Sequence, residues 1–269
     1  MPELPEVETT RRGIDPFLRN QRIASVIVRE TRLRWPISDQ VSQLQGRRIL
    51  DLSRRGKYLL MQLDEGNLIW HLGMSGSMKI LPSGTAAEVH EHVEMRMDNG
   101  QALKFRDPRR FGACLYTEED PLQHRLLLNL GPEPLGEAFN PDYLYRSCRN
   151  RRAAIKTVIM NSHIVVGVGN IYASEALFLA GIRPSRPAGR ISKQRISQLV
   201  ISIQHILTAA IEQGGTTLQD FTQADGNPGY FSQSLMVYGN RGSCSICGKA
   251  IRHIVQGQRS SYYCPGCQN

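Results

Sequence analysis

The first residues of the chain carry groups that could perform chemistry on a sugar. The sequence opens Met-Pro-Glu, and the small Pro2 permits removal of Met1. The mature chain would then begin with a secondary amine. Such an amine attacking a sugar C1′ gives an iminium ion, which has no N–H to lose and so remains an electron sink for elimination. Glu3 follows directly, and its carboxyl group could pass a proton to the ring oxygen of the sugar.

A helix is predicted to position these two residues. Pro5 suits the first turn of a helix, and Glu6 and Glu8 suit its positive end. The same positive end favours an unprotonated amine and attracts phosphate. On composition alone, however, Pro2 could merely cap the chain and Glu3 could be one more exposed acid.

Four cysteines at the C-terminus have the spacing of a metal site. Cys244, Cys247, Cys264 and Cys267 form C-x2-C-x16-C-x2-C. This spacing favours one structural Zn2+ bound by four thiolates, with no open position for catalysis. Two disulfides are the alternative, but they need an oxidising compartment, and the first residues do not have the cationic, apolar-core pattern of a signal segment. The ribbon between the cysteine pairs should be a short hairpin that presents Arg259.

The charge of the chain favours a polyanionic partner. Formal net charge is +9, and Arg supplies 27 of the 33 basic residues, which suits bidentate contacts to phosphate. The basic residues cluster in separate segments, as a groove lined by several loops requires, although genome base composition could also enrich Arg. The clusters are Arg54-Arg55-Gly56-Lys57, Arg106 with Arg109-Arg110, and Arg149 with Arg151 and Arg152.

We expect a cytoplasmic protein, because the longest apolar runs are too short to cross a bilayer.

Hydrophobic periodicity separates a β-rich first half from a helical second half. Residues 22–116 are predicted to form antiparallel strands, as a sandwich or a barrel, with a hairpin turn at Asp98-Asn99-Gly100. Residues 131–136 resemble a linker, and a polar stretch over 213–231 is predicted to be a loop. The predicted strands include 23–28, 49–63 and 68–72, and the predicted helices cover about 141–162, 169–181 and 192–213, the last with Ser192 as N-cap and Gly214-Gly215 at its end.

Several long motifs, in a fixed order from the first residue to the last, resemble formamidopyrimidine-DNA glycosylase. The resemblance implies an α+β multidomain fold: an N-terminal β-sandwich flanked by helices, and a C-terminal helical helix-two-turn-helix domain with a four-Cys zinc finger. We place these domains at 1–130, 131–235 and 236–269. The motifs are MPELPEVE, RGKY (55–58), HLGMSG (71–76), DPRRFG (107–112), VGVGNIYASEALF (166–178) and the four-Cys ribbon.

The resemblance also implies an activity and a set of catalytic residues. The family removes 8-oxoguanine and formamidopyrimidine bases from duplex DNA and then cuts the abasic site by β,δ-elimination. Pro2 matches its nucleophile and Glu3 its ring-opening acid. Lys57 matches the proton donor for β-elimination, and Arg259 matches the residue assigned to δ-elimination. Without the family, Lys57 and Arg259 would be ordinary surface charges.

Further residues match DNA contacts of the family. Extrusion of a base leaves a hole that needs an apolar wedge and a cation, and Met74, Arg109 and Phe111 match the residues that fill it. The alternatives are core packing for Met74 and a hairpin anchor for Phe111. The other matching contacts are Asn170 as the phosphate clamp, with His71, Lys57 and Arg259 as helpers, and His90, for which a solvated loop position is the alternative.

Two points remain open in the sequence: the DNA contact near residue 150 and the class of the protein. The family often has Lys at its basic DNA-contacting position near residue 150, and this chain has Asn150, so the contact either shifts to a neighbouring Arg such as Arg151 or is lost. An endonuclease VIII-like enzyme for oxidised pyrimidines, or a non-catalytic damaged-DNA-binding protein, would share the groove and the finger. We expect a monomeric bacterial, nucleoid-associated protein that binds double-stranded DNA with oxidised bases or abasic sites, and we expect no partner in a membrane.

Overall fold

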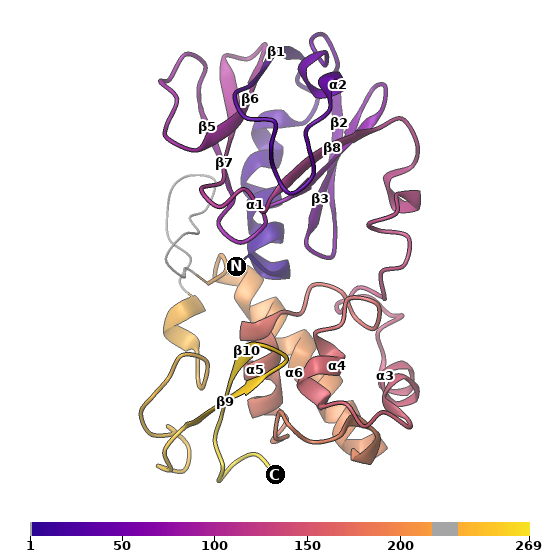
Figure 1. Ribbon diagram of the computed structural model, residues 1–269, viewed down its shortest axis with the longest axis vertical. Coiled ribbons are helices and arrows are strands. Elements are labelled where there is room, and N and C mark those ends of the chain that lie inside the picture. Colours follow the sequence, from indigo (N-terminus) through magenta and orange to yellow (C-terminus); the bar gives the residue numbers. More distant parts are fainter. Residues whose placement is uncertain (1, 217–230) are drawn as a thin grey trace. The chain divides into compact units, whose positions relative to one another are not determined.

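The computed structural model describes residues 2–216 and 231–269. Most of the predicted loop over 213–231 lies outside these described residues. The chain forms two compact units, coloured indigo to magenta and pink to yellow for the most part in Figure 1. The predicted division into three domains stays a prediction. The units are Met1–Asn129 with Gln213–Ser232, and Leu130–Glu212 with Gln233–Asn269.

The first unit is a β-sandwich of two four-stranded antiparallel sheets, with strand orders β1-β6-β7-β5 and β2-β3-β4-β8 (Figure 1). Apolar side chains from both sheets share one core, in which the rings of Trp70 and Phe105 meet edge to face at 5.4 Å. The prediction of antiparallel pairing is confirmed, and the sandwich is the form it takes. The strands are β1 (Ile23–Val28), β2 (Ile49–Arg55), β3 (Tyr58–Leu63), β4 (Asn67–His71), β5 (Ser77–Pro82), β6 (Glu91–Met97), β7 (Gln101–Arg106) and β8 (Ala113–Thr117).

Helix α1 (Leu4–Leu18) packs against both sheets of the sandwich, because it contacts β2, β3 and β5. Val7, Ile14 and Leu18 lie on one stripe of this helix and join the shared core. Pro5 occupies the first turn, as predicted. Two short helices complete the unit, α2 (Asp39–Ser42) and the 3-10 helix η1 (Pro121–Gln123).

Two tight turns in this unit connect paired strands. The hairpin predicted at Asp98-Asn99-Gly100 joins β6 to β7. The single strand predicted over 49–63 is wrong, because the chain reverses at Gly56 and Lys57. Gly56 has φ of 58°, which a glycine adopts without strain, and Arg55 then pairs with Tyr58 across a two-residue turn.

The second unit is built on helices. The continuous helix predicted over 141–162 is wrong: two shorter helices flank an irregular segment in which Asn150 has φ of 61°, a conformation that Asn tolerates better than most residues. Among the described residues, every helix is too short or too polar to span a membrane. The helices are α3 (Pro141–Cys148), α4 (Ile155–Ile159), α5 (Asn170–Leu179), α6 (Lys193–Glu212) and the 3-10 helix η2 (Ala188–Arg190). The 3-10 helix η3 (Phe231–Ser234) begins in the first unit and ends in the second.

Helix α6 has the boundaries that its sequence predicts. The hydroxyl of Ser192 accepts a hydrogen bond from the Arg195 N–H at 3.4 Å, as an N-cap does. Gly214 and Gly215 follow the helix with φ of 74° and 81°. The apolar stripe of α6, from Ile196 to Ala210, is buried, so this helix is part of the core.

The C-terminal finger is a hairpin of β9 (Arg252–Gln256) and β10 (Arg259–Tyr263). Gly257 and Gln258 connect the strands, both with positive φ, which matches the twist of a tight hairpin. Phe178 of α5 packs with buried side chains of the finger, so the finger shares a small apolar cluster with the helical part of its unit.

Candidate functional site

Pro2 and Glu3 lie at the start of α1, and both are buried. Glu3 is the N-cap residue and is 1% exposed. Its N–H donates to Glu6 Oε2 at 2.7 Å, and Glu3 and Glu6 form a capping box. The prediction that the chain start is held in place is confirmed. Pro2 therefore lies at the positive end of a fifteen-residue helix.

The second oxygen of Glu6 binds a segment far along the chain. Glu6 Oε1 accepts the N–H of Thr216 at 2.8 Å, and Glu6 is 2% exposed. Gly215 packs against it with φ of 81°, and a Cβ there would lie 3.1 Å from Glu6 Oε1. One buried carboxylate thus joins the residue after Pro2 to the chain that leaves α6. The sequence did not predict the contact of Glu6 with Thr216, although the spacing of Glu3 and Glu6 is that of a capping box.

Lys57 and His71 lie on neighbouring elements of one sheet. Lys57 is in the β2–β3 turn, and His71 ends β4, where its ring lies 4.8 Å from that of Tyr58. Burial, with the charges of Lys57 and Arg34, lowers the pKa of His71 to about 4. His71 is therefore neutral at pH 7. Its Nδ1 accepts the N–H of Gly73 at 2.9 Å, so Nε2 carries the proton and can act as a donor.

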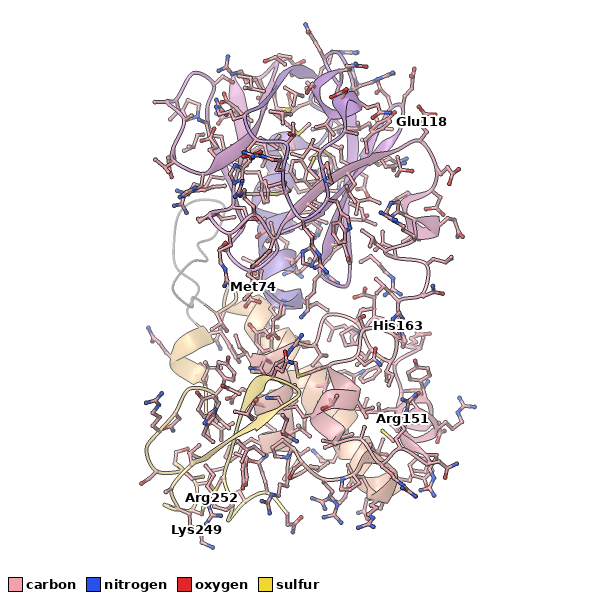
Figure 2. The ribbon with its side chains drawn as sticks, in the orientation of Figure 1. Met74, Glu118, Arg151, His163, Lys249 and Arg252 are labelled. Carbon is pink, nitrogen blue, oxygen red and sulfur yellow. The ribbon has the colours of Figure 1, made fainter. Side chains whose placement is uncertain are left out.

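Met74, Arg109 and Phe111 lie on two loops at one edge of the sandwich. Met74 is in the turn between β4 and β5 (Figure 2), and the other two are in the loop between β7 and β8. Met74 is 37% exposed and Phe111 44%, so neither is core packing. The guanidinium of Arg109 lies 5.1 Å from the centre of the Phe111 ring. The pair presents an apolar face and a cation side by side.

A buried acid, Asp107, joins these two loops and was not a predicted site residue. Asp107 is fully buried and accepts the hydroxyl proton of Ser75 at 2.7 Å. Its N–H donates to the carbonyl of His90 at 3.0 Å. His90 itself is exposed, with φ of 70°. Asp107 is the first residue of the DPRRFG motif, in which only Arg109 and Phe111 were predicted site residues.

Asn170 begins α5 in the second unit, directly after Gly169, close to the start of the helix predicted over 169–181. Its Oδ1 accepts a hydrogen bond from Lys156 Nζ at 2.7 Å, and its Nδ2 donates to the Tyr238 hydroxyl at 3.3 Å. Lys156 is 2% exposed and also donates to Ser260 O and Ser261 Oγ, both at 2.9 Å. This lysine, missed in the sequence, connects α4, the start of α5 and the finger hairpin.

Arg259 and Arg151 are exposed side chains of the second unit. Arg259 begins β10 and lines a cavity of about 320 Å³ between α4 and the hairpin, together with Lys156 and Asn161. Arg151 lies between α3 and α4 (Figure 2), and its Nε donates to Ser147 O at 2.6 Å. Neighbouring Asn150 holds the left-handed turn, so an Arg on either side supplies the charge of this segment.

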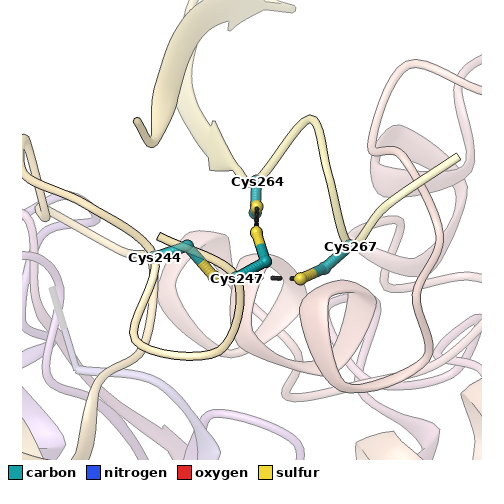
Figure 3. Close-up of side chains that lie close together, drawn as sticks. All are labelled: Cys244, Cys247, Cys264 and Cys267. Atoms are coloured by element: carbon teal, nitrogen blue, oxygen red, sulfur yellow. Dashed lines mark hydrogen bonds between the residues drawn. The ribbon is translucent and has the colours of Figure 1, made fainter. Parts of the chain in front are cut away.

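The four cysteines predicted to bind metal come together at the base of the finger (Figure 3). Their sulfur atoms all lie within 4.8 Å of one another, and each is a free cysteine. Cys247 and Cys264 are 3.3 Å apart at sulfur, and Cys244 and Cys267 3.8 Å. Tetrahedral ligands about 2.3 Å from zinc lie about 3.8 Å apart, so the cluster fits one structural Zn2+ without an open position.

The other two cysteines, Cys114 and Cys148, are buried thiols. Cys114 is fully buried, and burial raises its pKa well above the ordinary value. Burial likewise raises the pKa of Cys148 to about 11. Neither thiol is reactive at neutral pH, because the thiolate is the nucleophile.

Three family models match the chain in order. The formamidopyrimidine-DNA glycosylase N-terminal domain matches residues 1–114, and the H2TH domain of the same enzyme matches residues 130–222. A zinc finger found in FPG and IleRS matches residues 244–269. The matched ranges together span the sandwich, the helices and the finger.

Curated relatives and solved structures are similar to this chain over 99–100% of its length. Formamidopyrimidine-DNA glycosylase of Pseudomonas aeruginosa is 57% identical over 270 residues and covers 100% of both chains. A variant of Lactococcus lactis FPG in complex with Fapy-dG-containing DNA has a TM-score of 0.92 at 33% identity, covering 99% of both chains. The same holds for Lactococcus lactis Fpg in complex with DNA that contains an abasic site, also at a TM-score of 0.92, 33% identity and 99% coverage.

Proposed function

Because the chain belongs to the formamidopyrimidine-DNA glycosylase family, we propose that Pro2 is the nucleophile of its reaction and Glu3 the acid that assists it. The chain is a DNA glycosylase that removes oxidised purines in base-excision repair and also has abasic-site lyase activity. The observation that carries the proposal is the burial of both residues at the N-terminal end of α1. An exposed, frayed terminus would not hold an amine against one sugar carbon.

In this proposal the mature Pro2 nitrogen attacks C1′ of the damaged nucleotide, and the base leaves. The resulting iminium withdraws electrons, so a proton can be lost from C2′ and the 3′ phosphate eliminated. Glu3 is in place to protonate the ring oxygen as the sugar opens. The positive end of α1 supports the unprotonated amine and attracts the adjacent phosphate.

We assign two basic residues to the elimination steps. Lys57 in the β2–β3 turn serves β-elimination, and its charge also keeps His71 neutral. Arg259 at the start of β10 serves δ-elimination. Lys57 belongs to the first unit and Arg259 to the second, so the two assignments rest on the sequence motifs and on the exposure of Arg259.

The remaining predicted residues are proposed DNA contacts. Met74, Arg109 and Phe111 fill the space left by the extruded base, since one apolar and one cationic group are already paired there. His71 donates Nε2–H to phosphate, and His90, Arg151 and Asn170 contact the backbone of the strand. The partner is duplex DNA with an oxidised base or an abasic site, bound by a monomer on the nucleoid of the bacterial cytoplasm.

The lesion class follows the purine-specific branch of the related enzymes. Full-length identity of 57% to formamidopyrimidine-DNA glycosylase supports this choice over an endonuclease VIII-like enzyme. A parallel assay on duplexes with 8-oxoguanine or an oxidised pyrimidine measures the preference directly. Faster excision of the pyrimidine would contradict the purine assignment.

Borohydride trapping on duplex DNA that contains 8-oxoguanine tests the nucleophile. The processed, zinc-loaded protein should form a covalent adduct that maps to Pro2, because reduction fixes the iminium as a stable amine. A matched preparation that retains Met1 should bind the same duplex without forming the adduct. An adduct on another residue would overturn the assignment, and binding without any adduct would identify a non-catalytic damage binder.

A further inference from the structure

We propose that Asp107 and Ser75 are positioning residues that present Met74, Arg109 and Phe111 as one prearranged unit. The inference rests on the proposed hole-filling role of those three side chains. It assigns to two buried polar residues, which do not reach the surface, the task of fixing two loops against each other. Asp107 is fully buried and Ser75 is 3% exposed.

The cross-link consists of three hydrogen bonds, two between the loops and one within the β7–β8 loop. Asp107 Oδ1 accepts the hydroxyl proton of Ser75 at 2.7 Å. Asp107 Oδ2 accepts the N–H of Gly112 at 2.7 Å. Ser75 Oγ in turn accepts the N–H of Arg109 at 3.2 Å. Ser75, beside Met74, and Gly112, beside Phe111, therefore bind one carboxylate directly, and Arg109 is joined to it through Ser75.

Close backbone contact reinforces the cross-link. Gly73, directly before Met74, has φ of 65°, and a Cβ there would lie 2.4 Å from the carbonyl carbon of Phe111. It would also lie 2.5 Å from the N of Gly112. Only a glycine lets the two loops approach this closely. The loops thus touch through backbone at the position where their exposed side chains are displayed.

Prearrangement matters here because extrusion of a base costs unstacking energy, which the filling side chains offset. Loops that became ordered only on binding would lose conformational entropy at that moment, which weakens binding. A displacement of about 1 Å in positioned groups can lower a rate by about 100-fold. A buried carboxylate with three donors around it, directly or through Ser75, resists such displacement.

Ser75→Ala tests the proposal because it removes the hydroxyl at the centre of the cross-link and leaves little empty volume. Single-turnover excision of 8-oxoguanine from duplex DNA should fall about 10- to 100-fold. Cleavage of a single-stranded abasic oligonucleotide should be unchanged, because no orphaned base or hole exists there. Ser77→Ala is the matched control: Ser77 is 5% exposed, lies on β5 outside the cross-link, and its loss should leave both reactions unchanged.

Asp107→Asn provides a second variant of the same shape, with one acceptor oxygen replaced by an NH2 group. It should show the same separation between duplex and single-stranded substrates. Ser75→Ala should also have no further effect in a background that already carries Met74→Ala, Arg109→Ala and Phe111→Ala. An equal loss on both substrates, or an undiminished effect in that background, would overturn the proposal. Failure of the Pro2 chemistry is distinguishable, because the unaltered protein would then form no trapped adduct even on the single-stranded abasic site.

Discussion

At the start of the chain, two neighbouring residues are prepared for different tasks by the same helix terminus. Pro2 lies just outside α1, where the helix field opposes a positive charge, and Glu3 is fixed as the N-cap by the Glu6 carboxylate. The backbone of Glu3 is therefore positioned by hydrogen bonding. If Pro2 is the nucleophile, as we propose, covalent geometry alone keeps the Glu3 acid beside it.

Replacing the acid should separate base excision from binding. For Glu3→Gln we expect single-turnover excision of 8-oxoguanine to fall by about 100-fold or more, the usual contribution of a positioned proton donor. DNA affinity should change little, because Gln keeps the size and polarity of the side chain. Electrophoretic mobility shift and quench kinetics measure the two quantities. A loss of affinity equal to the loss of rate would contradict the assignment.

His71 shows how charge and burial determine a protonation state. Its pKa of about 4 lies below the ordinary 6.5 because burial and the charges of Lys57 and Arg34 disfavour the imidazolium. A base with a depressed pKa in the folded state stabilises the fold fully above its unfolded pKa. That contribution is lost as the pH falls from about 6.5 towards 4, because the unfolded state then takes up the proton.

Removal of the nearby charge should shift this pKa. Lys57→Met should raise the pKa of His71 towards 6.5, measured by NMR titration of the imidazole C–H signals. Lys79→Met, which removes a lysine paired with Glu88 instead, serves as the control and should leave the titration of His71 in place. An unchanged pKa in the Lys57 variant would show that burial alone sets the value.

At the scale of elements, one acid of α5 anchors the segment that leads into the zinc finger. Glu175 is fully buried, and its carboxylate accepts three backbone N–H groups, from Met236 at 2.8 Å, Val237 at 3.0 Å and Tyr238 at 2.7 Å. Burial raises its pKa, and the three hydrogen bonds offset only part of that rise. The acid therefore serves to satisfy backbone donors that would otherwise be buried without partners.

Loss of this anchor should destabilise the second unit. Glu175→Ala leaves three buried N–H groups without their acceptor and should lower the free energy of unfolding by about 2–4 kcal/mol. Denaturant unfolding monitored in the second unit, with zinc release as an independent readout, measures the effect. Ser174→Ala, at the adjacent buried position of α5, should cost less than about 1 kcal/mol. Equal costs would contradict the anchoring role.

The zinc finger depends on its metal, whereas the sandwich does not. Cys244→Ser should abolish zinc binding, unfold the β9–β10 hairpin and weaken DNA binding, since a four-Cys site supplies the folding energy of a small finger. The first unit should remain folded, because the core around Trp70 contains no finger residue. Metal analysis, circular dichroism and DNA affinity test this expectation. Unchanged affinity in the zinc-free variant would exclude a role for the finger in binding.

At the scale of the whole molecule, the excess of positive charge belongs to the second unit, which has 14 basic and 5 acidic residues, whereas the first unit has 19 of each. Basic clusters nevertheless occur in both units: at the β2–β3 and β7–β8 segments of the first, and between α3 and α4 and in the finger of the second. Binding to DNA should therefore depend steeply on salt, because each phosphate contact releases condensed counterions. The slope of log K against log salt counts those contacts.

One arginine can be tested in this way. Arg151→Ala should reduce the salt slope by about 1 and weaken binding uniformly across DNA sequences, as expected for a phosphate contact. Arg32→Ala is the control, because Arg32 is paired with Glu30 at 2.8 Å and its side chain is 79% exposed. The control should leave the slope unchanged. An unaltered slope in the Arg151 variant would place the contact on another residue of this segment.

Local signals in the sequence predicted much of the fold correctly. The hairpin at Asn99-Gly100, the apolar stripe of α6 and the cysteine spacing each depend on residues close together in the chain. The two errors, at 49–63 and 141–162, arose where a residue in the left-handed region turned the chain between two segments with the same periodicity. Gly56 and Asn150 are residue types that favour such turns, but the periodicity on both sides of them favoured one continuous element.

The sequence by itself determined which chemical groups this protein has and the family to which they belong, because those properties are carried by residue types and short spacings. Only the tertiary structure decided what holds those groups in place. The supporting hydrogen bonds join residues 32 positions apart at Ser75 and Asp107, 104 at Lys156 and Ser260, and 210 at Glu6 and Thr216. Such pairs leave no periodic or local trace, because they form only when packing of the apolar core brings distant segments together and excludes water from the polar groups between them.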